Sequence, residues 1–94
     1  MRAIEYSSAF KRDYQRAKAT PRYRADLDPL LSAVLQLLMN DRILPDSNHD
    51  HPLKGDWAGY RDCHIKPDLL LIYKKGDDNT LRLARLGSHS DLFR

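Results

Sequence analysis

Cysteine and long apolar runs are scarce in this chain. Its 94 residues include one cysteine, Cys63, so no disulfide can form within the chain. That usage is typical of a reducing compartment, and we expect a cytoplasmic protein. No apolar run approaches the roughly 18 residues that a membrane-spanning helix needs, so no membrane partner is expected. Arg2, Glu5 and Ser7 interrupt the region in which a secretory signal carries its apolar residues, and we expect no such signal.

A strong excess of charge of one sign is also missing. Sixteen Lys and Arg residues against 13 Asp and Glu residues give a net charge of +3. The pI near 9.2 lets the surface approach nucleic acid, but it excludes a histone-like polycation, and an ordinary solvated surface explains it equally well. A chain of 94 residues with 41% apolar residues can bury one hydrophobic core but not two. We therefore expect one domain over residues 1–94.

The N-terminal quarter predicts a strand followed by a helix. Residues 2–6 alternate as a short strand does. Ser7 or Ser8 is a suitable N-cap, because its hydroxyl can accept from the free amides of a first turn. Thr20-Pro21 ends or interrupts the helix. The residues that recur at helical spacing are Phe10, Tyr14 and Ala17.

A second helix is predicted between residues 27 and 40. Asp28 is the expected N-cap, with Pro29 in the first helical position, although helical structure that begins near Arg22 also fits. Pro45 lies beyond its end. The apolar stripe consists of Leu27, Leu30, Leu31, Val34, Leu35 and Leu38.

The rest of the chain predicts a long loop and three strands. Residues 43–57 form the loop, and the strands cover residues 59–65, 69–74 and 81–86. The run of apolar residues at 69–73 is typical of a central strand covered on both faces. The expected fold class is α+β, with a strand, two helices and a three-strand meander in one mainly antiparallel sheet packed by the helices. Periodicity leaves the order of the strands open.

Residues 49–68 concentrate groups that suit acid–base chemistry. This segment holds three of the four histidines among Asp, Lys and Arg residues, and His89 follows near the C-terminus. Histidine accepts and donates protons near neutral pH, and neighbouring carboxylates or cations can hold it in either role. The composition therefore predicts an acid–base site.

Polar, glycine and aromatic residues follow a specific spacing between residues 51 and 93. They are His51-Pro52-Leu53, Gly55, Trp57, Gly59-Tyr60-Arg61-Asp62, His64, Pro67-Asp68, Leu71-Ile72-Tyr73, Arg85, Gly87, His89 and Leu92-Phe93. This pattern resembles YafQ-type toxins of the RelE/ParE superfamily of bacterial toxin–antitoxin systems. The N-terminal half agrees in layout, so the resemblance covers essentially the whole chain.

The resemblance implies a small RelE-like fold and a ribosome-dependent endoribonuclease. Members of this family cut messenger RNA in the decoding site, need no metal and are neutralised by a cognate antitoxin. Operator DNA would be a partner only through the antitoxin complex. The implied active site consists of His51, Asp62, His64, Asp68, His89 and Phe93, and Tyr73 and Arg85 are further RNA-binding candidates.

The residue types themselves fit RNA cleavage, because the ribose 2′-hydroxyl is a nucleophile that RNA supplies. The enzyme needs a base for that hydroxyl, an acid for the 5′-oxygen and a cation for the phosphorane. We expect His51 or His89 to be the base and the other the acid, both outside regular elements, with His64 and Asp68 shaping the site. The cation candidates are Lys54, Arg61, Lys66 and Arg85.

Strand alternation places Asp62 and His64 on one face, where the carboxylate can orient an imidazole. Each candidate also has an ordinary structural interpretation. His64 can be a satisfied histidine on a half-buried strand, and Asp68 a turn aspartate. Trp57 and Tyr60 are expected to pack the loop against the core. Phe93, beside the chain end, suits stacking on a nucleobase.

A metal site is the main chemical alternative at these residues. His49, His51, Asp62 and His64 are ligand types that zinc accepts, but Pro52 follows His51 directly and no second tight ligand pair exists. We expect no metal or other cofactor.

Two other functions share the expected fold. A ParE-like toxin that inhibits DNA gyrase lacks this histidine set, so the histidines argue against it, and a non-catalytic interaction module is the third possibility. Codon preference, the identity of the antitoxin and the stoichiometry of their complex have no signal in the sequence.

Overall fold

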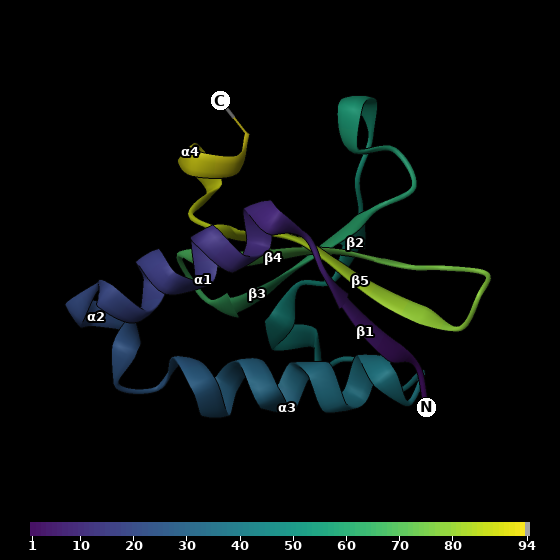
Figure 1. Cartoon of the computed structure of the whole chain (residues 1–94), viewed down its shortest axis with the longest axis horizontal. Coiled ribbons are helices and arrows are strands. Elements are labelled where there is room, and N and C mark those ends of the chain that lie inside the picture. The colour runs from purple at the N-terminus through teal and green to yellow at the C-terminus, as the bar shows by residue number, and fades with distance from the viewer. Residues whose placement is uncertain (94) are drawn as a thin grey trace.

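One five-stranded sheet organises the computed structural model, which describes residues 1–93 (Figure 1). The strands lie in the order β1-β5-β4-β3-β2. β1 runs parallel to β5, and every other neighbouring pair is antiparallel. The bounds are β1 Ala3–Tyr6, β2 His51–Pro52, β3 Arg61–Lys66, β4 Leu69–Lys75 and β5 Thr80–Gly87. This confirms the α+β class and the meander, and it supplies the strand order that periodicity left open.

The first helix begins where the sequence predicts. In α1 (Ser8–Ala19), the Ser7 hydroxyl oxygen accepts a 2.9 Å hydrogen bond from the backbone N–H of Phe10. This contact satisfies one of the amides that a first helical turn leaves without a partner.

The predicted N-cap of the second long helix is wrong, whereas the alternative that helical structure begins near Arg22 is confirmed in part. α3 (Leu27–Met39) has Asp26 at its N-cap instead of Asp28, and a separate turn, α2 (Pro21–Arg24), precedes it. Pro29 is tolerated inside α3 because it still lies in the first turn, where no backbone N–H has a partner within the helix. Among residues 1–93 no helix has the length and apolar character to cross a membrane.

The central strand β4 separates two apolar clusters. Leu69, Leu71 and Tyr73 belong to the main core beneath α1 and α3, while Leu70 and Ile72 belong to a smaller cluster on the opposite face. All five are at most 2% exposed, which confirms that this strand is covered on both faces. Burial of each leucine stabilises the fold by roughly 1.5–3 kcal/mol. We call the face with the smaller cluster the open face, because short segments border it instead of long helices.

Residues 43–57 contain short elements that were predicted as one loop. They are the 3₁₀ turns η1 (Asp46–Asn48) and η2 (Gly55–Trp57), with the two-residue strand β2 between them. The predicted packing of Trp57 and Tyr60 is confirmed, since both pack against the open-face cluster with ring centroids 5.2 Å apart.

A fourth helix, α4 (His89–Leu92), was not predicted. Its capping box joins Ser88 and Asp91, a spacing visible in the sequence as S-x-x-D. Gly87 permits the close return of this helix, because an added Cβ would lie 3.3 Å from Leu92 Cδ2. His51 in β2 and His89 in α4 thus lie within regular elements, contrary to expectation.

Candidate active site on the open face

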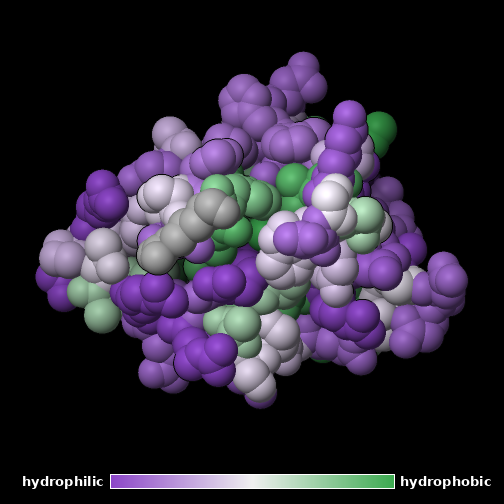
Figure 2. Space-filling model, turned by 90° about the horizontal axis from the view of Figure 1, so that it is seen from above, coloured by the Kyte–Doolittle hydropathy of each residue, from purple (hydrophilic) through white to green (hydrophobic). Residues whose placement is uncertain are grey.

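Four residues form a single rung across the sheet. His51 lies opposite Asp62, Asp62 opposite Ile72, and Ile72 opposite Arg85. Neighbouring strands are about 4.8 Å apart, so the rung spans roughly 14 Å from β2 to β5. Cross-strand partners share a face, so the side chains project from the open face with Ile72. Viewed from above, this side has apolar surface at its centre and hydrophilic side chains around it (Figure 2).

His51 and Asp62 are in close contact at one end of the rung. His51 Nε2 lies 3.1 Å from Asp62 Oδ1, and His51 Nδ1 lies 2.8 Å from the carbonyl oxygen of His49. A carbonyl can only accept, so Nδ1 carries the proton and donates it. The Nε2 lone pair of a neutral His51 would then face the carboxylate. The lone pair and the carboxylate would repel each other. A proton bound to either Nε2 or Oδ1 would remove this repulsion.

Asp62 is a buried carboxylate with an unsatisfied oxygen. The residue is 3% exposed, and within residues 1–93 no hydrogen-bond donor is aligned with its Oδ1. Burial raises the pKa of Asp62, while positive charge on His51, His64 and His89 lowers it. Three histidines therefore act on this one carboxylate, which is the electrostatic centre of the site.

α4 brings His89 and Phe93 to the open face. Their ring centroids are 5.0 Å apart, and Phe93 packs against the open-face cluster beside Leu92. Across the described part of the chain, the ring of His89 contacts Phe93 and neither of its nitrogens takes part in a hydrogen bond. His89 is therefore available to exchange a proton with a ligand, whereas both nitrogens of His51 already have contacts.

Arg85 is held at the other end of the rung by Asp13, a residue that sequence reasoning missed. Asp13 accepts from Arg85 Nε at 2.7 Å, from Arg85 Nη2 at 3.3 Å and from Arg16 Nη2 at 2.7 Å. It also accepts from the backbone N–H of Leu86 at 3.0 Å, where β5 has passed the end of β1. The sequence does contain a signal for Asp13: it lies three residues after Phe10, so a charged residue occupies the apolar side of the predicted helix.

Tyr73, predicted to contact RNA, is buried. Its side chain faces the main core at 1% exposure, and its hydroxyl donates a 2.5 Å hydrogen bond to Asp50. Arg61 binds the same carboxylate through two nitrogens, at 3.2 and 3.3 Å. Burial and Asp50 raise the pKa of the Tyr73 hydroxyl, so it stays protonated. Tyr73 and Arg61 thus anchor the segment that carries His51.

Asp68 and Lys66 lie at the β3–β4 turn, against α2. The Tyr23 hydroxyl donates to Asp68 Oδ2 at 3.1 Å, and Arg22 Nη1 lies 3.3 Å from the same oxygen. Lys66 Nζ pairs with Asp26 at 2.8 Å. These contacts fix the turn, and they give the Lys66 charge an internal partner. Tyr23 had no identifiable signal in the sequence.

His64 extends the site toward the β3 edge. Its ring centroid is 5.1 Å from that of His49, and its carbonyl accepts a 2.7 Å hydrogen bond from Asn48. Lys54 is exposed in the turn before η2. Within residues 1–93 no group of three or more His, Cys, Asp or Glu side chains is arranged to hold a metal ion.

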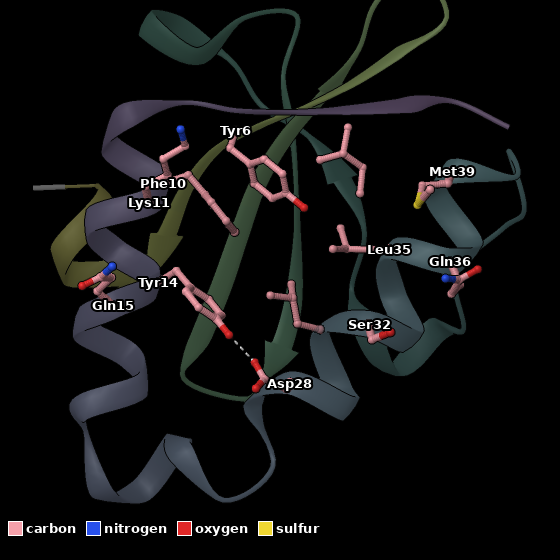
Figure 3. Close-up of a pocket in the computed structure, with 12 residues that line it drawn as sticks. Tyr6, Phe10, Lys11, Tyr14, Gln15, Asp28, Ser32, Leu35, Gln36 and Met39 are labelled. Carbon is pink, nitrogen blue, oxygen red and sulfur yellow. Dashed lines mark hydrogen bonds between the residues drawn. The ribbon is translucent and has the colours of Figure 1, made fainter.

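A separate apolar groove of about 730 Å³ lies between β1, α1 and α3 (Figure 3). Tyr6, Phe10 and Leu35 line it, and the Tyr14 hydroxyl donates to Asp28 across its rim at 2.5 Å. None of the predicted site residues lines this groove. The acid–base groups are therefore on the open face and not in this groove.

The fold and site define a small α+β protein with a histidine–carboxylate site on an open sheet face. The family described as bacterial toxin of type II toxin–antitoxin system, YafQ, matches residues 2–94. The mRNA interferase toxin YafQ of Escherichia coli K12 is 41% identical over 92 residues, covering 98% of this chain and 96% of that protein. The chain belongs to the YafQ family of toxins.

Solved structures agree with this placement. The crystal structure of the E. coli DinJ–YafQ complex matches with a TM-score of 0.84 at 41% identity, covering 100% of both chains. A metal-bound toxin from Helicobacter pylori matches with a TM-score of 0.84 at 45% identity, covering 99% of this chain and 100% of that one.

Proposed function

We propose that this chain is an mRNA interferase, an endoribonuclease toxin that cuts messenger RNA on the ribosome in the cytoplasm. The observation that carries the proposal is the His51–Asp62 pair with His89 above the same face, in a chain of the YafQ family. The curated E. coli relative is named as an mRNA interferase. Such a site can move two protons around one phosphate.

The reaction uses the 2′-hydroxyl of the RNA as nucleophile. A base removes the 2′ proton as the bond between O2′ and phosphorus forms, and an acid protonates O5′ as its bond to phosphorus breaks. The products are a 2′,3′-cyclic phosphate and a 5′-hydroxyl. We assign the acid to His51, whose Nε2 lies 3.1 Å from Asp62 Oδ1, and the base to His89, whose ring nitrogens make no hydrogen bond within residues 1–93.

The remaining residues bind and shape the substrate. Arg85 stabilises the phosphorane, because Asp13 fixes a guanidinium that is still 29% exposed. Phe93 stacks on a base beside His89. His64 and Asp68 shape the end of the site, and Lys54 contacts the RNA backbone. No step needs a metal, although the H. pylori relative was solved with metal bound.

The chemistry of the cut ends tests this mechanism. Purified protein, translating ribosomes and a short messenger should give a 2′,3′-cyclic phosphate or its 3′-phosphate product, resolved by mass spectrometry. A 3′-hydroxyl end would refute the mechanism, because it requires a nucleophile other than the 2′-oxygen.

A sulfur leaving group tests which histidine is the acid. A messenger with a 5′-bridging phosphorothiolate at the cleavage site leaves as a thiolate, which needs no protonation. His51→Ala should cut this messenger nearly as fast as the unsubstituted protein does, while His89→Ala should stay slow. The opposite pattern would reverse the assignment.

We also propose a cognate antitoxin as partner, as in the solved E. coli complex. The pI near 9.2 suits an acidic, partly disordered segment that folds on binding. Operator DNA would be contacted only through that complex. Affinity for the product of a neighbouring gene should fall markedly with salt, as measured by calorimetry at several ionic strengths, and a salt-independent affinity would contradict the electrostatic part.

A further inference from the structure

The open face continues beyond the rung toward the β4–β5 hairpin. Lys74 follows Ile72 by two residues, so it lies about 7 Å further along β4 on the same face. It is opposite Arg82 on β5, and Arg82 is opposite Glu5 on β1. We call Lys74 and Arg82, together with Tyr60 beneath Lys74, the basic row. It is parallel to the rung that holds His51 and Arg85.

Lys74 is positioned by its surroundings but has no carboxylate partner. Its Nζ lies 5.3 Å from the centroid of the Tyr60 ring, and an added Cβ on Gly59 would lie 3.7 Å from that atom. In the described part of the chain no ion pair involves Lys74, whereas the adjacent Lys75 binds Asp41 at 3.0 Å. A charge that is held in place without a partner is ready for an anionic ligand.

Arg82 has one carboxylate partner, which is exposed. Its Nε and Nη2 lie 3.3 and 3.2 Å from Glu5 Oε1, and both side chains are nearly half exposed. The Tyr60 hydroxyl and Glu5 raise the pKa of Arg82, so it is always charged. Exposed ion pairs of this kind contribute little, and one can be exchanged for a stronger contact at low cost. The row therefore carries two cations against one carboxylate.

We propose that Lys74 and Arg82 bind the backbone phosphate adjacent to the scissile one in the messenger RNA. This subsite rests on the proposed function, because the rung must hold the scissile phosphate. Ala84, which belongs to the apolar open-face cluster, lies between Arg82 and Arg85 on β5, so a nucleoside can cross the face at this point while its two phosphates meet cations at either side. An acidic segment of a protein partner is less well matched, since the row shares its face with the acid–base residues.

Adjacent lysines on opposite faces provide a matched test. Lys74→Ala and Arg82→Ala should each slow single-turnover cleavage on programmed ribosomes by about tenfold, the effect of one lost charge-assisted hydrogen bond. Lys75→Ala removes the same charge from the other face and should cut at the unsubstituted rate. Circular dichroism and thermal melting check that each variant is folded.

Changes in the messenger complete a double-mutant cycle, in which a protein substitution is combined with the loss of one phosphate charge. A methylphosphonate, which carries no charge, replaces the phosphate on either side of the cleavage site in turn. At one of these positions it should slow the unsubstituted protein by about tenfold and should not slow Lys74→Ala or Arg82→Ala further.

Three results would overturn the subsite. In the first, Lys74→Ala and Arg82→Ala both cut natural messenger at the full rate. In the second, each methylphosphonate slows these variants by the same factor as it slows the unsubstituted protein, and in the third the variants lose affinity for the antitoxin but keep their cleavage rate. Failure of the unsubstituted protein to cut natural messenger would instead overturn the proposed function.

Discussion

Asp13 and Asp62 are both 3% exposed carboxylates, but the structure treats them in opposite ways. Asp13, at the edge of β5, accepts four hydrogen bonds from Arg85, Arg16 and the Leu86 backbone. Asp62, in the centre of the site, has an Oδ1 with no aligned donor and an imidazole at 3.1 Å. A saturated buried carboxylate stabilises a fold, whereas an unsatisfied one costs free energy.

This difference in hydrogen bonding separates a structural role for Asp13 from a role in proton transfer for Asp62. Asp13 holds Arg85 in a single geometry because every lone pair has a partner. Asp62 keeps an oxygen that a proton on His51 can reach, which is the arrangement that proton transfer requires. Natural proteins lose stability at such sites, so the contrast predicts that substitutions of the two aspartates change stability in opposite directions.

The largest expected effect is on the histidines beside Asp62. His51→Ala and His89→Ala should each lower messenger cleavage by about 10²–10⁴-fold, because each removes one partner of the proton transfer. Growth arrest on expression should disappear with them. Single-turnover cleavage on translating ribosomes measures the loss, with thermal melting as the control for folding. Full cleavage by either variant at matched concentration would remove that histidine from the mechanism.

Removal of the saturated carboxylate should be nearly as severe, but in stability. Asp13→Ala leaves Arg85 without its partner and the Leu86 amide without an acceptor, so unfolding in urea should lose about 3 kcal/mol. In a double substitution with Arg85→Gln, Asp13→Ala should cause little further loss of cleavage, because Asp13 acts on the reaction through Arg85. An unchanged urea midpoint for Asp13→Ala would contradict the supporting role.

Asp62→Asn should change stability in the opposite direction from Asp13→Ala. The variant should lose about 10²-fold in cleavage. At neutral pH it should be more stable than the unsubstituted protein by about 1 kcal/mol, because an amide has no charge to desolvate. Urea unfolding of both proteins at several pH values measures the difference, and a variant that is less stable at pH 7 would contradict an unsatisfied Asp62.

The pH dependence follows from the raised pKa of Asp62. Its ordinary value is 3.8, and burial places the folded value higher. Between the two values the folded state binds a proton that the unfolded state has released. The unsubstituted protein therefore loses stability as pH rises through this window. The advantage of Asp62→Asn should shrink as pH falls through it and vanish below 3.8.

The smallest effect tests how His89 is placed above Asp62. Ser88→Ala removes the hydroxyl that caps Asp91 N, which should cost about 1 kcal/mol in the stability of α4. Hydrogen exchange at residues 91–93 should quicken, and cleavage should fall by a smaller factor than in His89→Ala. Unchanged exchange at these amides would show that the Leu92 and Phe93 packing alone holds the helix.

Local signals were enough for most elements. Ser7 as N-cap and the run at residues 69–73 follow from the immediate neighbours, and the structure confirms them. The stripe of α3 is confirmed at Leu27, Leu31, Val34 and Leu38, whereas Leu30 is 38% exposed. The N-cap of α3 was wrong because Asp26 and Asp28 lie on either side of Leu27, the first residue of the stripe, and the sequence offers both as caps. The capping box of α4 is present in the sequence as Ser88 and Asp91, but a four-residue helix has too few residues for periodicity to predict it.

The sequence by itself determined the fold class, the family and which residue types the site contains, since these depend on periodicity and fixed spacing. Only the tertiary structure decided that His51, Asp62 and Arg85 share one rung, that Asp13 holds Arg85, and that Tyr73 faces the core. Cross-strand register and side-chain contacts join residues far apart in the sequence, such as Asp13 and Leu86 at 73 positions apart, and no local pattern carries that information.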